Sequence, residues 1–309
     1  MDTAFREVAQ GLRFPEGPVA LADGNLLVTE VGGGTLVRIG RDGRLDTVAD
    51  LGGGPNGAAL GPDGACYVCN NGGLEFIDEP GHGLRPRGTP ASYTGGSIQR
   101  VDLRTGRFET LYEAVDGRRL CGPNDLVFDR QGGFWFTDHG KAHGRRRDFG
   151  SVLYARADGS LIREVLFPIA TPNGIGLSPD ERTLYVADTE SARVLAYEIV
   201  GEGALRLLPW PAPHHGHLLA ALGGRYQRLD SLAVDSEGHV CVATINHAGI
   251  TRISPDGQRI DHLPTTDILT TNICFGGPDL RTAFVTLSGQ GRVVACDWPV
   301  PGHPLNFSA

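Results

Sequence analysis

Short apolar runs follow one another along the whole chain, and a polar turn separates each run from the next. The run AALG at 58–61, for example, is followed by the turn Asp63-Gly64 and then by ACYVCN at 65–70. Two apolar runs joined by a short turn that contains Asp or Gly are typical of a β-hairpin. Few windows place apolar residues at the spacing of an amphipathic helix. The pattern therefore predicts an all-β protein.

A polar residue precedes the first run of each hairpin, and this anchor returns six times. The anchors are Glu16, Asn56, Asn124, Asn173, Asp230 and Asn272. They are spaced about 40 to 70 residues apart, and further strands follow most of the hairpins. Units of about four strands repeated at this period predict a six-bladed β-propeller. We expect a single domain over residues 1–309, with the segment TAFREVAQ near the N-terminus as the outer strand of the last blade.

The anchors are expected to form a ring around one mouth of the central channel, because the first strand of each propeller blade lines that channel. Two carboxylates and four amides are hard oxygen ligands, which suit Ca²⁺, Mg²⁺ or Mn²⁺ better than a thiolate-rich zinc site. The alternative is structural, since Asn and Asp before a strand often bind their own turn backbone.

A second set of polar residues ends the second strand of each unit and includes Glu30, Asn70, Asp138 and Asp188. These residues could orient the anchors, line the pocket or cap the strand ends. His139 follows Asp138 directly and is a further candidate to face the pocket. The segment 76–96 is rich in Gly and Pro and reads as a long loop, which either lies over the channel mouth as a lid or is a plain surface excursion.

Composition and charge argue against several other functions. The formal net charge is -8 at pH 7, and the longest basic run is GRRRD at 144–148, which reads as a solvated loop rather than a nucleic-acid or phosphate patch. The N-terminal residues lack the pattern of a signal peptide, and no apolar stretch approaches the ~20 residues of a membrane helix. The six cysteines read as buried thiols. These features predict a cytoplasmic protein without nucleic-acid or membrane partners.

Five motifs in a fixed order resemble the SMP-30/gluconolactonase family over nearly the whole chain. They are FPEGP, GPNDLVFD with GGFWFTD, TPNGIGLSPDERTLYVADT, LDSLAVDSEG, and TTNICFGGPD with AFVT. The resemblance implies a six-bladed propeller with one divalent cation at the channel mouth. It also implies calcium- or zinc-dependent hydrolysis of aldonolactones and related lactones.

The resemblance also implies roles for individual residues. Glu16, Asn173 and Asp230 would bind the cation, with Asp230 also acting as general base. The residues expected to contact substrate are Asn124 (which could instead be a further cation ligand), Asn56, Asp138, His139 and Asn272. The chain departs from the family at Gly122, where animal members carry an arginine that holds substrate hydroxyls. It also departs at Asn272, where many relatives have a small hydroxyl residue.

The sequence thus predicts a metal-dependent lactonase that opens a small lactone, an aldonolactone or a related one, to its hydroxy acid. The expected cofactor is one divalent cation, Ca²⁺ first, with Zn²⁺, Mn²⁺ or Mg²⁺ as alternatives. The alternative enzymes are a propeller that acts on another ester or cyclic substrate and one that uses the same metal for a non-hydrolytic reaction. The alternative from another class is a non-catalytic propeller that only binds partners.

Overall fold

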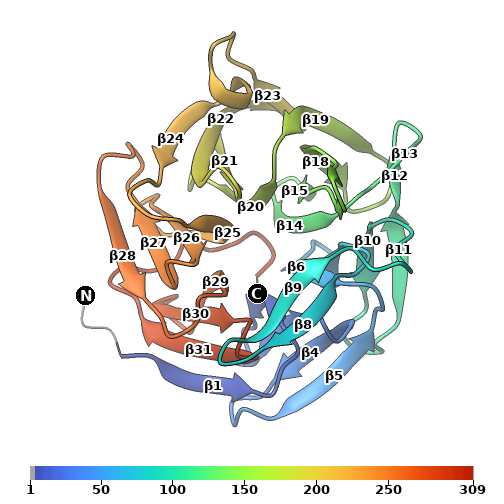
Figure 1. Cartoon of the computed structure of the whole chain (residues 1–309), viewed down its shortest axis with the longest axis vertical. Coiled ribbons are helices and arrows are strands. Elements are labelled where there is room, and N and C mark those ends of the chain that lie inside the picture. Colours follow the sequence, from blue (N-terminus) through green and yellow to red (C-terminus); the bar gives the residue numbers. More distant parts are fainter. Residues whose placement is uncertain (1–3, 309) are drawn as a thin grey trace.

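The computed structural model describes residues 4–308 and contains six antiparallel sheets that surround a central axis (Figure 1). Blade 1 consists of β2 (Pro15–Ala20), β3 (Leu26–Glu30), β4 (Thr35–Ile39) and β5 (Leu45–Asp50). Blade 2 consists of β6 (Pro55–Leu60), β7 (Cys66–Asn70), β10 (Ser97–Val101) and β11 (Phe108–Tyr112). Blade 3 consists of β14 (Pro123–Phe128), β15 (Gly133–Asp138), β18 (Gly150–Arg156) and β19 (Ile162–Ile169).

The remaining blades follow the same order from the channel outward. Blade 4 contains β20 (Pro172–Leu177), β21 (Thr183–Asp188) and β22 (Arg193–Gly201), with β23 (Ala204–Arg206) and β24 (His217–Ala221) both paired to β22. Blade 5 contains β25 (Arg228–Val234), β26 (Val240–Ile245), β27 (Gly249–Ile253) and β28 (Ile260–Pro264). Blade 6 contains β29 (Thr270–Gly276), β30 (Thr282–Leu287), β31 (Arg292–Asp297) and β1 (Arg6–Gln10). The predicted six-bladed β-propeller is confirmed.

The first strand of the chain closes the ring, as the sequence predicted. β1 pairs antiparallel with β31, with Arg6 opposite Ala295, so the last blade is completed by residues from the start of the chain. This pairing covers a sheet edge that an open array would expose. The expected strand segment began at Thr3, which lies outside the described residues. That one domain spans all of residues 1–309 stays a prediction for the same reason.

Apolar side chains pack between neighbouring blades, which explains why the second strands are apolar on both faces. Trp135 and Phe136 are fully buried in β15, and the ring of Tyr67 in blade 2 meets Phe128 in blade 3 edge to face at 5.1 Å. Aromatic pairs of this kind add to the burial of apolar area. The rigid body of packed blades holds the inner strands in place around the channel.

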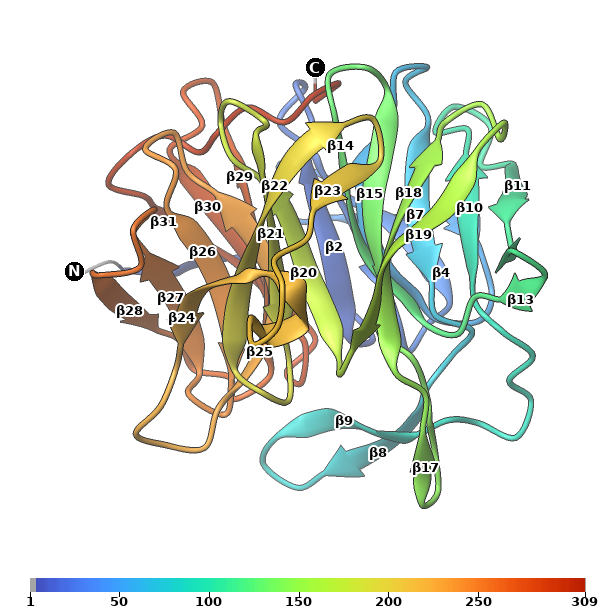
Figure 2. The ribbon, with the colours of Figure 1, turned by 90° about the horizontal axis from the view of Figure 1, so that it is seen from above.

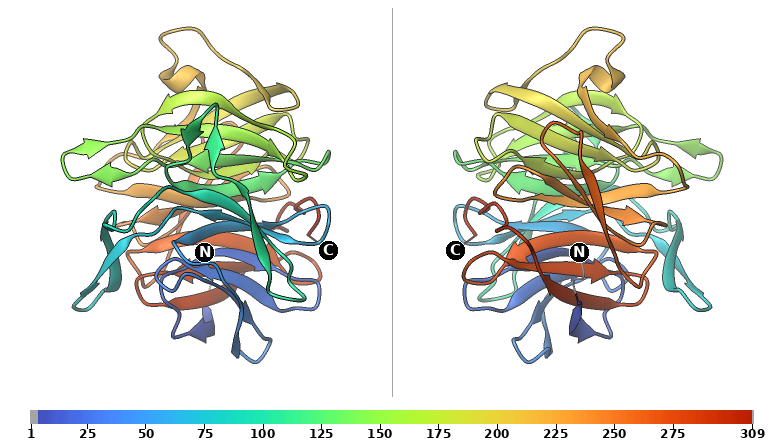
Figure 3. Two further views of the ribbon diagram at one scale, coloured as in Figure 1. Left: turned by 90° about the vertical axis from the view of Figure 1, so that its right-hand side faces the viewer. Right: turned by 90° about the vertical axis from the view of Figure 1, so that its left-hand side faces the viewer.

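Two hairpins project from one face of the propeller, and the C-terminus lies on the opposite face (Figures 2 and 3). One hairpin is formed by β8 (Glu75–Glu79) and β9 (Gly83–Gly88), the other by β16 (Ala142–His143) and β17 (Arg146–Arg147). Both follow the end of a second strand, which pairs with the start of the inner strand of its blade. The anchors therefore lie on the hairpin face.

The segment 76–96 is more ordered than the loop that the sequence predicted. Its β8–β9 hairpin reaches from blade 2 to blade 6, where the Leu84 amide donates a hydrogen bond to the Gly289 carbonyl at 2.9 Å. The ring of Phe76 lies 5.1 Å from that of Phe14 in blade 1. These contacts are non-local, which is why the composition of the segment did not reveal them. The hairpin covers the blade 6 and blade 1 side of the mouth.

Smaller elements complete the structure. A short hairpin pairs β12 (Ala114–Val115) with β13 (Arg118–Arg119), and a 3-10 turn, η1, spans Pro213–His215. Within residues 4–308, no helix has the length and apolar character needed to cross a membrane. The GRRRD run lies in the exposed β16–β17 hairpin, on the same face as the anchors.

Candidate functional site

The six anchors lie on the six inner strands, which contact one another in turn around the channel. All six anchor side chains are buried. In every inner strand the pairing with the second strand is irregular beside the anchor. Irregularities of this kind redirect a side chain away from the ordinary alternation of a strand. The anchor that recurs in the sequence thus coincides with an irregular strand pairing that recurs in every blade and turns a polar group toward the channel mouth.

The backbone after the first anchor shows how closely the blades approach one another. Gly17 has φ +49°, and a Cβ atom there would lie 2.3 Å from the Asn56 carbonyl oxygen of the next blade. Only glycine adopts this conformation and tolerates this contact without strain. The glycine after Glu16 therefore brings the first two anchors together.

Three amide oxygens of the ring are buried and have no hydrogen-bond partner among residues 4–308. They are Oδ1 of Asn56, Oδ1 of Asn124 and Oδ1 of Asn173. Buried polar atoms in folded proteins almost always have a partner, so three orphaned acceptors on consecutive blades require an explanation. Together with the carboxylates of Glu16 and Asp230 they form a set of hard oxygen donors, which fits Ca²⁺ or Mg²⁺ in kind. The residues present therefore fit a divalent cation.

Among residues 4–308, the carboxyl groups of Glu16 and Asp230 have no cationic side chain in salt-bridge contact. Burial raises the pKa of Glu16 to about 7, although hydrogen bonds from Asn272, Thr271 and the Gly17 amide act against the rise. Burial and the nearby Glu16 raise the pKa of Asp230 well above its usual value, and a hydrogen bond from Asn173 opposes this. A bound cation would favour the charged forms of both groups.

Asp125 is a third buried carboxyl that the sequence reasoning missed. Burial raises its pKa to about 7, and the charge of Glu16 contributes to the rise. The sequence pattern marks its neighbour Asn124 as the anchor, and adjacent residues of a regular strand face opposite sides, so the pattern does not point to Asp125. β14 is irregular between Pro123 and Leu126, so this alternation does not hold there. The recurring irregular strands would have been the signal to consider both residues.

The polar residues at the ends of the second strands bind backbone. The carboxylate of Asp138 accepts hydrogen bonds from the amides of Cys121 and Gly122, both at 2.7 Å, and of Gly140 at 2.9 Å. Asp188 accepts two hydrogen bonds from Thr171, one from its amide at 2.8 Å and one from its hydroxyl at 2.7 Å. In each case the bonded loop leads directly into the inner strand of the same blade.

Glu30 and Asn70 repeat this arrangement in blades 1 and 2. Glu30 accepts a hydrogen bond from the Arg13 amide at 2.6 Å, and Asn70 accepts one from the Gly54 amide at 2.9 Å. These residues could orient the anchors, line the pocket or cap the strand ends, and the hydrogen bonds to the loops before the anchors favour the first of these roles. The structure thus places Asp138 behind the ring, where its carboxylate is bound to backbone amides.

Gly122 is required by its surroundings. A Cβ atom at this position would lie 2.9 Å from the carbonyl oxygen of Gly140, tighter than ordinary contacts allow. An arginine at this position, as in the animal proteins that the sequence resembles, would therefore require a different path of the loop that Asp138 holds.

His139 lies at the rim of the mouth, where its side chain is half-buried. Its Nδ1 is 3.2 Å from the carbonyl oxygen of Pro172, which precedes the anchor Asn173. Burial, together with the charge of Arg147, lowers the pKa of His139 to about 3. The imidazole is therefore neutral at physiological pH, and it can offer a hydrogen bond without adding charge.

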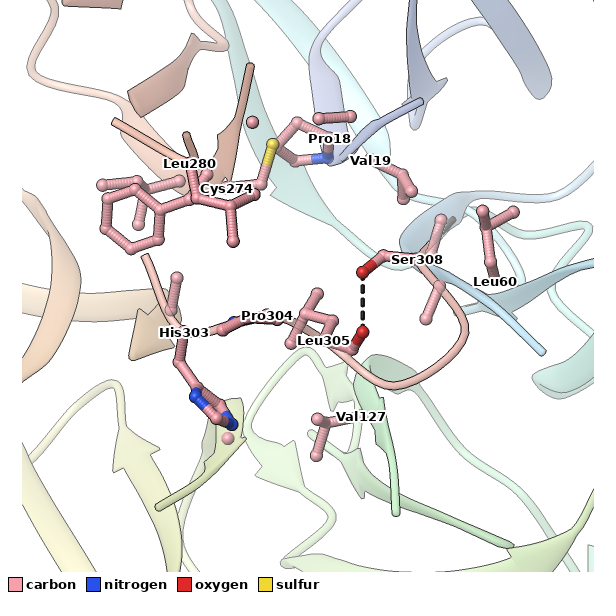
Figure 4. Close-up of a pocket in the computed structure, with 18 of the residues that line it drawn as sticks. Pro18, Val19, Leu60, Val127, Cys274, Leu280, His303, Pro304, Leu305 and Ser308 are labelled. Carbon is pink, nitrogen blue, oxygen red and sulfur yellow. Dashed lines mark hydrogen bonds between the residues drawn. The ribbon is translucent and has the colours of Figure 1, made fainter. Parts of the chain in front are cut away.

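A cavity of about 700 Å³ continues along the channel on the far side of the ring. Asp125 and Asn272 line its ring end, and apolar side chains such as Val19, Leu60 and Val127 line much of the rest (Figure 4). The segment 303–308 crosses it, and Asn306 Nδ2 donates to the Phe128 carbonyl at 3.1 Å and to Glu181 Oε1 at 2.6 Å. The polar ring thus forms one end of this cavity.

The fold and the ring define a class of six-bladed propellers with an oxygen-rich polar site at one channel mouth. The chain belongs to the SMP-30/gluconolactonase/LRE-like family, whose sequence profile matches residues 14–289. It is 30% identical over 234 residues to the 6-deoxy-6-sulfogluconolactonase of Pseudomonas putida. The matched region covers 74% of this chain and 76% of the relative.

Two solved structures extend the comparison. A gluconolactonase from Xanthomonas campestris superposes with a TM-score of 0.74 at 25% identity, over 96% of this chain and 90% of that one. A calcium-binding protein, regucalcin, from Agrobacterium tumefaciens superposes with a TM-score of 0.74 at 19% identity, over 98% of this chain and 96% of that one. The second likeness shows the shared fold alone.

Proposed function

We propose that this protein is a metal-dependent lactonase that hydrolyses a small lactone, an aldonolactone or a related ring, to its hydroxy acid. At the level of its class it is a lactone-hydrolysing enzyme, because the family profile covers most of the chain and similar proteins are named as lactonases. The observation that carries the finer proposal is the buried ring of carboxylates and orphaned amide oxygens. A propeller that only bound partners would have no use for that ring.

The cation would be held by Glu16, Asn173 and Asp230, with Asn124 as a further ligand or a contact to substrate. Ca²⁺ is the first candidate because all the donors are oxygen atoms, with Zn²⁺, Mn²⁺ and Mg²⁺ as alternatives. When bound, such a cation polarises the lactone carbonyl and lowers the pKa of a water molecule.

Asp230 would act as general base in the hydrolysis. Its carboxylate accepts a proton from the water molecule that attacks the lactone carbonyl carbon, and general bases of this kind contribute about 10²- to 10⁴-fold to rate. The side-chain amide of Asn124 donates a hydrogen bond to the oxyanion that develops on the carbonyl oxygen. The ring C–O bond then breaks, and the leaving alkoxide takes up the proton from Asp230.

The other ring residues would orient the substrate. Asn56 and Asn272 would bind substrate hydroxyls, and His139 would offer its Nε2 from the rim. Asp138 would act indirectly, by holding the loop of Cys121 and Gly122 that leads to Asn124.

The test is a pH-indicator assay of lactone hydrolysis. Protein stripped with a chelator and protein reloaded with Ca²⁺, Mn²⁺ or Zn²⁺ would be compared on γ- and δ-lactones, both sugar and non-sugar. We expect no turnover after stripping and recovery after reloading. Absence of turnover on every lactone, with cation binding shown by calorimetry, would instead direct attention to another ester, a cyclic substrate or a non-hydrolytic reaction.

A further inference from the structure

Two threonines join the anchors of neighbouring blades through their side-chain hydroxyls. Thr29 is the next-to-last residue of β3, where it pairs with the anchor Glu16, and its Oγ1 donates a hydrogen bond to the backbone carbonyl of Asn56 at 2.6 Å. Thr137 is the next-to-last residue of β15, and its Oγ1 donates a hydrogen bond to the backbone carbonyl of Asn173, also at 2.6 Å. Each bond runs from a second strand to the anchor of the following blade.

Thr137 also binds the peptide group that follows the anchor of its own blade. Its Oγ1 accepts a hydrogen bond from the Asp125 amide at 3.2 Å, and this amide belongs to the peptide group that joins Asn124 to Asp125. The same hydroxyl therefore connects the anchor peptide of blade 3 with that of blade 4. The side chains of Thr29 and Thr137 are both fully buried, so bulk water has no access to these bonds and cannot take over when a hydroxyl is removed.

The bonded peptides are those of the three anchors whose amide oxygens are orphaned. The Oδ1 atoms of Asn56, Asn124 and Asn173 have no hydrogen-bond partner among residues 4–308 that would fix them directly. The position of such an oxygen depends on the backbone that carries it. The two threonines hold that backbone on the carbonyl side of all three asparagines.

A purely structural explanation is that each hydroxyl satisfies a buried carbonyl that an irregular strand pairing leaves free. The pairing is irregular in all six blades, however. At the corresponding position blades 2, 4 and 5 carry residues without a hydroxyl, namely Cys69, Ala187 and Ala243. Blade 6 carries Thr286, whose contact with the Asn272 carbonyl, at 3.5 Å, stays within its own blade. The irregular pairing therefore does not by itself account for the threonines of blades 1 and 3.

We propose that Thr29 and Thr137 are positioning residues of the site, each of which sets the anchor of the following blade through its backbone. Thr137 positions Asn173 for the cation, and Thr29 positions Asn56 for the substrate. The inference rests on the proposed function, because the roles of these two asparagines come from it. It adds that the ring is adjusted in two pairs of blades, with blade 1 setting blade 2 and blade 3 setting blade 4.

The experiment compares Thr137→Val with Thr29→Val, which remove the same hydroxyl from two equally buried positions, so that each variant is the control for the other. Ca²⁺ alone is titrated by calorimetry, and hydrolysis of glucono-δ-lactone is measured over a range of Ca²⁺ concentrations. We expect Thr137→Val to bind Ca²⁺ about tenfold more weakly and to recover its turnover at saturating Ca²⁺. Thr29→Val should keep the calcium affinity of the wild type and show a KM about tenfold higher, which added Ca²⁺ does not correct.

Serine variants separate the hydroxyl from the packing of the methyl group. Thr137→Ser and Thr29→Ser keep the donor, so both should retain the calcium affinity and the KM of the wild type within about twofold. A residue that only packed would tolerate valine and suffer from serine, and that order of effects would overturn the inference. If Thr137→Val does not fold, Thr137→Cys takes its place, because it copies Cys69 of blade 2 and keeps a weak donor. It should bind Ca²⁺ more weakly than Thr137→Ser.

Cation binding and turnover distinguish a failure of this inference from a failure of the lactonase function. Equal calcium affinities in the wild type, Thr137→Val and Thr29→Val, with lactone still hydrolysed, would overturn the inference and leave the lactonase function standing. Equal losses of affinity in both valine variants would also overturn it, because a general loosening of the ring would then be responsible. If the wild type binds Ca²⁺ and hydrolyses no lactone, the lactonase function falls, and a loss of affinity confined to Thr137→Val still supports the inference.

Discussion

Asn272 Nδ2 donates a hydrogen bond to Glu16 Oε2 at 3.0 Å, across the junction between the last and the first blade. The two anchors stand at opposite ends of the sequence repeat, and the closure of the propeller brings them side by side. The bond orients the Glu16 carboxylate and partly offsets the effect of burial on its pKa.

Asn272→Ala removes this hydrogen bond, so the pKa of Glu16 should rise above its value of about 7. More of Glu16 is then protonated at neutral pH, and affinity for Ca²⁺ should fall about tenfold, as expected for the loss of one charge-assisted hydrogen bond. Calcium titration between pH 6.5 and 8.5 measures this change. Asn25→Ala, in an exposed turn, is the control, and identical titration curves for Asn272→Ala and wild type would contradict the prediction.

The stability of the cation-free protein should depend on Glu16. Its pKa is about 7 in the folded state and near 4.3 in an unfolded chain, so the folded state binds more protons between these values and stability falls as the pH rises through this window. From pH 5 to 8, Glu16→Gln should lose less stability than wild type, by about 2 kcal/mol. Urea unfolding in the presence of a chelator measures the stability of both proteins at each pH.

Histidines with lowered pKa values, such as His139, have the opposite pH dependence. They are present in both proteins, so the difference between the two reports the charge of Glu16 together with its effect on the pKa values of Asp125 and Asp230. Added Ca²⁺ should abolish most of that difference, because it binds the charged carboxylate of the wild type. If the stabilities of the two proteins in chelator changed with pH in the same way, Glu16 would not be the group responsible.

Asp230→Asn should reduce kcat about 10³-fold, since the amide cannot accept the proton of the attacking water. Affinity for the cation should also fall, because one of the two ring carboxylates is lost. Stopped-flow indicator assays and calcium titration measure the two effects. Near wild-type turnover would show that another group is the base.

Asp138→Ala should weaken catalysis without removing any group that contacts substrate. Three backbone amides lose their acceptor, so the loop before Asn124 is released and stability should fall by about 2 kcal/mol. We expect both kcat and cation affinity to decline, with the pH profile unchanged. Asp188→Ala, which releases the loop before Asn173, should behave alike. A direct role of Asp138 in binding substrate would instead raise KM alone.

Much of the fold could be predicted from the sequence, because the turn and anchor recur with each blade. The six anchors, from Glu16 in blade 1 to Asn272 in blade 6, mark the inner strands. β1 closes blade 6 as expected. The β8–β9 hairpin could not be predicted, since Leu84 and Phe76 find their partners far away in sequence. Asp125 was missed because its position depends on an irregular pairing that a regular strand pattern hides.

The candidate site was predicted as a list of polar residues, and the ring gathers the six anchors as expected. Their roles as ligands, base and substrate contacts stay predictions. The sequence left three readings open for Asp138, and only the hydrogen bonds from Cys121, Gly122 and Gly140 separate them.

The bonds from the second strand to the loop before each anchor have a consequence for how such a site changes over generations. Glu30, Asn70, Asp138 and Asp188 each hold the loop of their own blade. The backbone that carries each of these anchors is therefore held within its own blade, although the anchors themselves are bonded between blades, as Asn272 is to Glu16. A propeller built in this way can exchange one polar group and keep the backbone of the other blades, so that a new substrate can be reached through single replacements.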